Sequence, residues 1–259
     1  MTKNSITVAI AFLLSLLAFG CVFVLPLLTK TLINTPDNPN KEVSGTTGKQ
    51  RTIWLLFHDE GTLLGTVAVV GDTRTLTLQT IGIPAETEIT SGTQLITLQE
   101  AFQKEGEKVA ELLAKQTEMD IDGTITLSVS AVTECIRRIS GNLSYTLTEP
   151  VGRLPASTLT LTPLQIADIF RYNQWSQGVR GRAQIYAELT ALFLEKALKK
   201  DTQSTFGILS EVSDSRLHIS GFVAIQDDLA LLKNTSCTSK VAEGKVSGNE
   251  QSPHYVLYH

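Results

Sequence analysis

Two short segments of the 259-residue chain hold residues whose types and spacing could do chemistry. The first is FHDE, in which His58, Asp59 and Glu60 directly follow the apolar run 52–57. Ligands of α/β proteins bind at the ends of strands, so this segment is a candidate site. A solvated turn after a strand is the simpler interpretation, and these residues alone favour it.

The second segment, RYNQWSQGVRGR (171–182), gathers arginines and aromatic residues: Arg171, Arg180, Arg182, Tyr172 and Trp175. A guanidinium group donates two parallel hydrogen bonds to anionic oxygens, which suits it to phosphate. Arginines around a glycine-containing link beside a helix start could therefore form an anion pocket. A set of solvent-exposed arginines explains the segment equally well.

Other known constellations are absent from the sequence. There is no Gly-rich phosphate loop, GxSxG elbow, HExxH or CxxC motif, and the cysteines and histidines lack metal-ligand spacing. The net charge of −4 removes the bulk electrostatic case for binding nucleic acid. Cys135 lies on an apolar helical face, which favours a buried free thiol over a disulfide with Cys237.

The elements that must position these residues alternate between strands and helices. Apolar runs and period-two alternation predict strands, and apolar residues at helical spacing predict helices between them. The predicted strands are 52–57, 63–70, 74–83, 123–129 and 143–148, of which the second and third form a hairpin. The predicted helical stretches are 98–113 and 132–139. This order predicts an α/β fold, with a central mixed sheet covered by helices in a layered α/β/α sandwich.

The helix start at Thr162 is the clearest local signal. Thr162, Pro163 and Gln165 combine an N-cap hydroxyl, proline at the first helical position and a residue that closes a capping box. The helix should run to about Arg171, and a polar link (173–181) should lead to a second helix over 182–200.

Residues 6–28 contain no charged residue and are long enough to span a bilayer, which predicts an uncleaved transmembrane anchor. A cleaved signal peptide and a lipid-modified Cys21 are the alternatives. The short tail 1–5 then stays in the cytoplasm, and the rest of the chain is extracytoplasmic. A flexible stalk (29–50), a folded domain (51–200) and a less regular C-terminal extension (201–259) follow.

Five segments in this order resemble the LytR-CpsA-Psr (LCP) family of membrane-anchored α/β domains. LLFHD (55–59) resembles its LLGxD strand, GIPAET (82–87) its SIPRDT motif, and IDGTITLS (121–128) its central strand. LTPLQIADIFRYN (161–173) resembles the helix that ends in an Arg-x-Arg pair, and GVRGR (178–182) resembles GDxGR.

The resemblance implies transfer of a polyprenyl-pyrophosphate-linked glycopolymer onto peptidoglycan at the membrane, with Mg²⁺ or Mn²⁺ and arginines holding the pyrophosphate. Carried over by motif, the phosphate-binding residues are Arg171, Arg182, Glu86 and Asn173, and the metal ligand is Asp59. Ala85 and Asn173 replace arginines of the family pattern, and Leu64, Glu86 and Val179 fall where it has aspartates.

Replacing arginines and aspartates of the family pattern weakens the stabilisation of a pyrophosphate transition state. The resemblance with these departures therefore predicts a cell-envelope protein that binds the lipid-linked glycopolymer with reduced or absent transferase activity. An active transferase with altered geometry and a non-catalytic scaffold for wall assembly are the competing hypotheses.

Overall fold

The structure is a computed structural model that describes residues 49–200, 202–213, 228, 230–249 and 252–258. All of them belong to one compact unit, Thr47–His259. The predicted anchor (6–28) and Cys21 lie outside the described residues. Within the described ranges, no helix has both the length and the hydropathy needed to cross a membrane.

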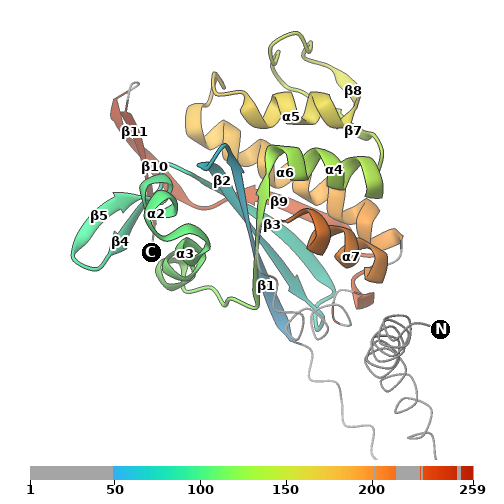
Figure 1. Cartoon of the computed structure of the whole chain (residues 1–259), viewed down its shortest axis with the longest axis horizontal. Helices are drawn as coiled ribbons and strands as arrows, with labels where there is room; N and C mark the ends of the chain where they lie inside the picture. Colours follow the sequence, from blue (N-terminus) through green and yellow to red (C-terminus); the bar gives the residue numbers. More distant parts are fainter. Residues whose placement is uncertain (1–48, 201, 214–227, 229, 250–251, 259) are drawn as a thin grey trace, which may run out of the picture. The chain divides into compact units, whose positions relative to one another are not determined.

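A five-stranded sheet with the order β6-β1-β2-β3-β9 forms the centre of the unit (Figure 1). Strands β1 (Gln50–Asp59), β2 (Thr62–Asp72) and β3 (Thr77–Pro84) form an antiparallel meander. Strand β6 (Gly123–Ser128) runs parallel to β1, and β9 (Cys237–Val241) runs parallel to β3. The predicted mixed sheet and its early hairpin are confirmed.

Helices cover both faces of this sheet, because β1 is apolar on both sides. Ile53, Leu55 and Phe57 belong to one core cluster, and Trp54 and Leu56 to the other. The first face is covered by α4 (Val129–Ile139), α5 (Pro163–Arg171), α6 (Gly178–Lys199) and α7 (Thr202–Val212), and the second by α2 (Leu98–Glu105), η1 (Gly106–Lys108) and α3 (Val109–Thr117) (Figure 1).

The capping box predicted at Thr162 is present, whereas two helix boundaries differ from the sequence interpretation. The helical spacing from 98 to 113 is divided because Gly106 has a φ of 61°, which a helix interior does not adopt. Helix α6 begins at Gly178 rather than at residue 182. Burial of Val179 and Ala183 compensates for two glycines in the first turns of this helix.

Three two-stranded hairpins complete the unit: β4 (Glu88–Ser91) with β5 (Gln94–Thr97), β7 (Leu143–Thr146) with β8 (Thr158–Leu161), and β10 (Gly244–Asn249) with β11 (Ser252–Leu257). The last of these packs on the segment after β3. Tyr255 is fully buried, its backbone forms a bridge with Thr87, and its N–H donates to the Glu86 carbonyl. The chain after residue 200 thus contributes both to the sheet and to the surroundings of Glu86.

Helix α6 lies so close to β3 that glycine is required at the contact. A Cβ atom on Gly82 would lie 2.0 Å from the carbonyl oxygen of Ala183. A Cβ atom on Gly65 of β2 would lie 2.9 Å from the ring of Tyr186. Backbone, rather than a flexible side chain, blocks position 82.

We expect Gly82→Ala to destabilise the fold by about 3 kcal/mol or more, because α6 would have to move away from the sheet. Gly207→Ala is the matched control, since nothing lies within 4 Å of its added Cβ and alanine favours a helix. Urea denaturation of both variants measures the effect. Equal stability of Gly82→Ala and the wild type would contradict the close approach.

Candidate functional site

The first ion pair of the site joins the ends of β1 and α5. Arg171, the last residue of α5, donates from Nε and Nη2 to the two carboxylate oxygens of Asp59, the last residue of β1, at 2.8 and 3.2 Å. The guanidinium holds the pKa of the Asp59 carboxyl below its usual value. Arg171 is 49% exposed, so solvent weakens this pair.

The second ion pair is more deeply buried and joins β3 to α6. Arg182 donates from Nη2 to both carboxylate oxygens of Glu86, which lies two residues after β3. Side-chain exposure is 13% for Arg182 and 18% for Glu86. The Nε atom of Arg182 is buried and has no hydrogen-bond partner among the described residues. One strong donor of this guanidinium is therefore left unsatisfied.

These two side chains lie in a groove of about 640 Å³. The link before α6 forms one wall, and the β10–β11 hairpin forms the other; the lining residues are Glu86, Asn173, Trp175, Ser176, Gln177, Gly178, Val179, Arg182, Val246, Gly248 and Pro253. Both oxygens of Glu149 accept from the backbone N–H of Ser176, at 3.1 and 3.0 Å. The wall formed by the link is therefore mostly polar, whereas the hairpin contributes the apolar side chains of Val246 and Pro253.

The structure brings together three of the four predicted phosphate-binding residues. Glu86, Asn173 and Arg182 line the groove, whereas Arg171 lies outside its lining and pairs with Asp59. Ala85, where the family pattern has an arginine, is fully buried in the core cluster of the second sheet face. An arginine would therefore not fit at this position without opening the core.

Three aromatic rings of the first core cluster pack together near the residues of the ion pairs in the chain. Tyr186 stacks on Phe170 with centroids 4.4 Å apart and meets Phe57 edge-on at 5.9 Å. Its hydroxyl donates to the Phe170 carbonyl. Burial raises the pKa of Tyr186, and the charges of Arg182, Glu86 and Asp59 also act on it. Tyr186 is thus buried next to the charged residues of both pairs.

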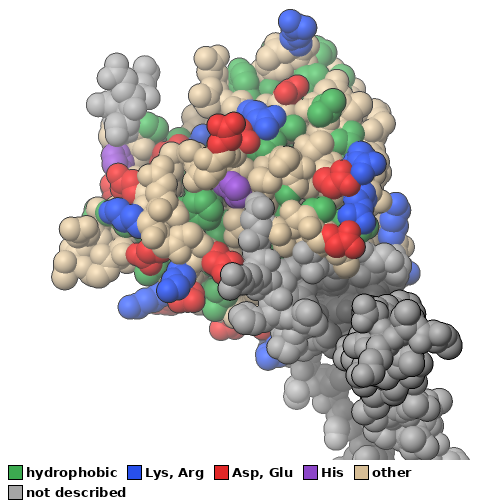
Figure 2. All heavy atoms as spheres, viewed as in Figure 1, with side chains coloured by type: hydrophobic (Ala, Val, Ile, Leu, Met, Phe, Trp, Pro, Cys, Tyr) green, Lys and Arg blue, Asp and Glu red, His purple; other side chains and the backbone are tan. Residues whose placement is uncertain are grey.

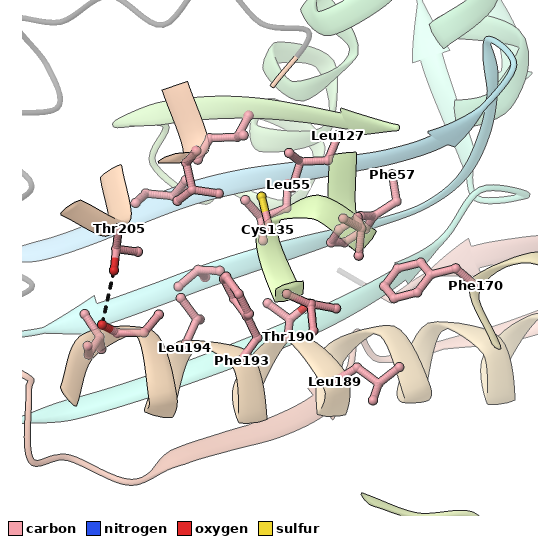
Figure 3. A pocket seen from close by; sticks show the side chains of 18 residues that line it. Leu55, Phe57, Leu127, Cys135, Phe170, Leu189, Thr190, Phe193, Leu194 and Thr205 are labelled. Carbon is pink, nitrogen blue, oxygen red and sulfur yellow. Dashed lines mark hydrogen bonds between the residues drawn. The ribbon is translucent and has the colours of Figure 1, made fainter. Parts of the chain in front are cut away.

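An apolar cavity of about 80 Å³ lies between the first sheet face and helices α4–α7. Figure 3 shows side chains from the strands and from α6 directed into a common space, including Leu55, Leu127, Phe193 and Leu194. Phe57 and Phe170 line it, and they precede Asp59 and Arg171 in the chain. This part of the cavity wall is therefore close in the chain to the first ion pair.

Cys135 also lines this cavity, and burial raises its pKa to about 12. It is a free thiol, as the sequence predicted, and Cys237 is free as well. The disulfide left open in the sequence analysis is not formed.

The surroundings of Asp59 do not fit a divalent metal in this arrangement. Both of its carboxylate oxygens accept from Arg171, and the described part of the chain holds no cluster of three or more His, Cys, Asp or Glu residues that could bind a metal.

The charged side chains are mixed on the face shown in Figure 2. Basic and acidic groups alternate across it, and the described residues visible there form no broad basic patch. Such a surface lacks the clustered cations that neutralise nucleic-acid phosphates.

No family model and no curated protein sequence matches the chain. Solved structures do match. Bacillus subtilis TagT is 14% identical, with a TM-score of 0.63, and 87% of this chain and 88% of TagT are covered. Bacillus subtilis TagV is 13% identical, with a TM-score of 0.62 and coverages of 81% and 91%. TagT and TagV are LCP proteins.

The chain has an LCP-like fold. The same fold is found in a transcriptional regulator from Enterococcus faecalis, which is 15% identical with a TM-score of 0.67 and coverages of 81% and 82%. At these identities the comparison establishes the fold alone.

Sequence reasoning missed the contributions of Glu149 and of the β10–β11 hairpin. Glu149 is 27 residues from Ser176, and the hairpin residues Val246 and Pro253 lie more than 150 residues after Glu86. No local pattern connects these positions. The sequence marked the groove only through the polar link 173–181 and through Glu86, Asn173 and Arg182.

We expect Asp59→Asn to lower the free energy of unfolding at pH 7 by about 0.5 kcal/mol, as is usual for exposed pairs. The folded-state pKa of Asp59 is depressed, so its contribution is present above the unfolded value of about 4 and is lost as the pH falls through the folded value. Urea denaturation across this pH range measures the difference. A difference that does not change with pH would contradict the pair.

Proposed function

We propose that this chain is an extracytoplasmic, membrane-anchored cell-envelope protein that binds a polyprenyl-(pyro)phosphate-linked glycopolymer. It takes part in attaching this polymer to peptidoglycan, and its own transferase activity is reduced or absent. Residues 6–28 provide the anchor. The fold is shared with TagT and TagV, LCP proteins involved in attaching wall teichoic acid, and TagT has been solved bound to LI-WTA.

The observation that carries the proposal is the apolar cavity whose lining residue Phe170 directly precedes Arg171 in the chain. Its walls are almost wholly aliphatic and aromatic, with Thr190 and Thr205 as the polar exceptions, and the hydroxyl of Thr205 donates to the Ala197 carbonyl (Figure 3). A prenyl chain gains by burial in such surroundings. Its phosphate would then lie at the end marked by Phe57 and Phe170, near Arg171.

The cavity must widen before it can hold a prenyl chain. About 80 Å³ is less than the ~150 Å³ of an engineered cavity that binds benzene. The walls are built from side chains of separate helices, including Leu194 of α6 and Leu209 of α7. Small outward movements of these helices would enlarge the space without breaking the central sheet.

The charges of the site favour a low transferase activity. Arg171 and Arg182 are each paired with a carboxylate of the chain, so these four groups carry no net charge. Asn173 and the buried Ala85 add no cation. A pyrophosphate transition state needs preorganised positive charge or donors aimed at the developing charge. The site in this state supplies little of either.

We expect the full-length chain, purified with detergent, to bind farnesyl phosphate in calorimetry. The double variant Arg171→Ala/Arg182→Ala should bind at least about tenfold more weakly, because each charge-assisted hydrogen bond contributes roughly 1.5–3 kcal/mol. The matched control is Arg74→Ala/Arg137→Ala, which removes two exposed arginines away from the site.

Absence of binding by the wild type would overturn the lipid-binding proposal and favour the scaffold alternative. An equal loss in the control would assign the effect to net charge rather than to the site.

We expect no transfer of a lipid-linked glycopolymer, even with added Mg²⁺ or Mn²⁺. Asn173→Arg restores a family cation at an exposed position of the groove and is expected to raise any residual turnover. Product analysis by mass spectrometry measures both. Turnover by the wild type at the level of an active transferase would contradict the reduced activity.

A further inference from the structure

The buried carboxylate of Glu86 is in direct contact with the cation that an anionic ligand of the groove would need. Glu86 and Arg182 both line the groove, and both oxygens of the carboxylate accept from Arg182. Among the described residues, no other arginine lines it. An anion entering the groove therefore meets a guanidinium that is already paired.

We propose that Glu86 is an internal competitor for the anion site on Arg182, and that it thereby weakens the binding of anionic headgroups in the groove. In the native chain, an anionic headgroup binds Arg182 only by displacing Glu86. The groove therefore binds an anionic headgroup, a diphosphate included, more weakly than it would with an unpaired Arg182. The lipid part of this inference rests on the proposed function, whereas the competition at Arg182 does not.

The geometry of the pair supports displacement. Both contacts come from Nη2, so Glu86 does not use the two-nitrogen fork by which arginine binds a carboxylate most strongly. The Nε atom remains buried and unpartnered within the described structure. A buried donor without a partner is costly, and a phosphate oxygen that reached Nε would remove this cost.

Hydrogen bonds of the main chain fix the Glu86 backbone beside Arg182. The Glu86 carbonyl accepts from the Tyr255 N–H, and the neighbouring Thr87 bridges to Tyr255. Tyr255 is fully buried, and its hydroxyl donates to the Ala242 carbonyl at 2.6 Å. On the other side of Glu86, the Ala85 carbonyl accepts from the Gln99 N–H at 2.9 Å. The main chain is thus held on both sides, and displacement has to occur by rotation of the Glu86 side chain.

The test compares the full-length wild type with Glu86→Gln in calorimetry, using farnesol, farnesyl diphosphate and inorganic pyrophosphate. Removing the carboxylate should strengthen binding of farnesyl diphosphate and of pyrophosphate by about tenfold or more, because the guanidinium is no longer neutralised. Binding of farnesol should stay unchanged. Adding Arg182→Ala to Glu86→Gln should abolish the gain.

Glu88→Gln is the matched control, since it removes the same charge two residues further along the chain. The Glu88 side chain pairs with His254 and does not line the groove. An equal gain in this control, or no gain for the diphosphates in Glu86→Gln, overturns the proposal. Glu86→Ala provides a second variant without the carboxylate if Glu86→Gln does not fold.

The outcomes separate this inference from the proposed function. If farnesol binds neither chain, and farnesyl diphosphate gains in Glu86→Gln but binds no more tightly than pyrophosphate, the competition at Arg182 stands and lipid binding fails. If the prenyl probes bind the wild type and Glu86→Gln shows no gain, the proposed function stands and the competition fails.

Discussion

The close approach of α6 to β3 determines where both parts of the site lie. Gly82 allows the carbonyl of Ala183 to lie against the strand, and Arg182 is the preceding residue of the helix. The same placement brings Tyr186 against Gly65 and Phe170. One helix-to-strand contact therefore positions the cation of the groove and the aromatic residues at the end of the apolar cavity.

The carboxylates around this contact change what the fold can do. An unpaired arginine beside an apolar cavity would bind a lipid phosphate, because desolvation strengthens the attraction between the two charges. Here each site arginine already has a carboxylate partner, and Ala85 is part of the core. The fold therefore retains an apolar cavity, while the two site arginines and their carboxylate partners together carry no net charge.

Local patterns predicted the parts of the fold that depend on neighbouring residues. The continuous apolar run 52–57 predicted a strand, and β1 is buried on both faces, while the capping box at Thr162 is formed as expected. Helix α6 began earlier than expected, because packing of Val179 and Ala183 outweighs the low helix propensity of glycine.

Long-range contacts could not be predicted in this way. The partners Glu86 and Arg182 are 96 residues apart, and the order of motifs indicated only that both belong to one site. Their mutual pairing, the hairpin wall and the burial of Ala85 depend on how distant segments pack. Family motifs can thus locate a site without showing whether its charges are available to a ligand.

A crystal structure of the full-length chain with farnesyl phosphate would test the account most directly. We expect a prenyl chain between Leu55, Leu127 and Phe193, with α6 and α7 moved apart. We also expect a phosphate within hydrogen-bond distance of a site arginine whose carboxylate partner has rotated away. A cavity that stays at about 80 Å³ without ligand, with both ion pairs unchanged, would contradict it.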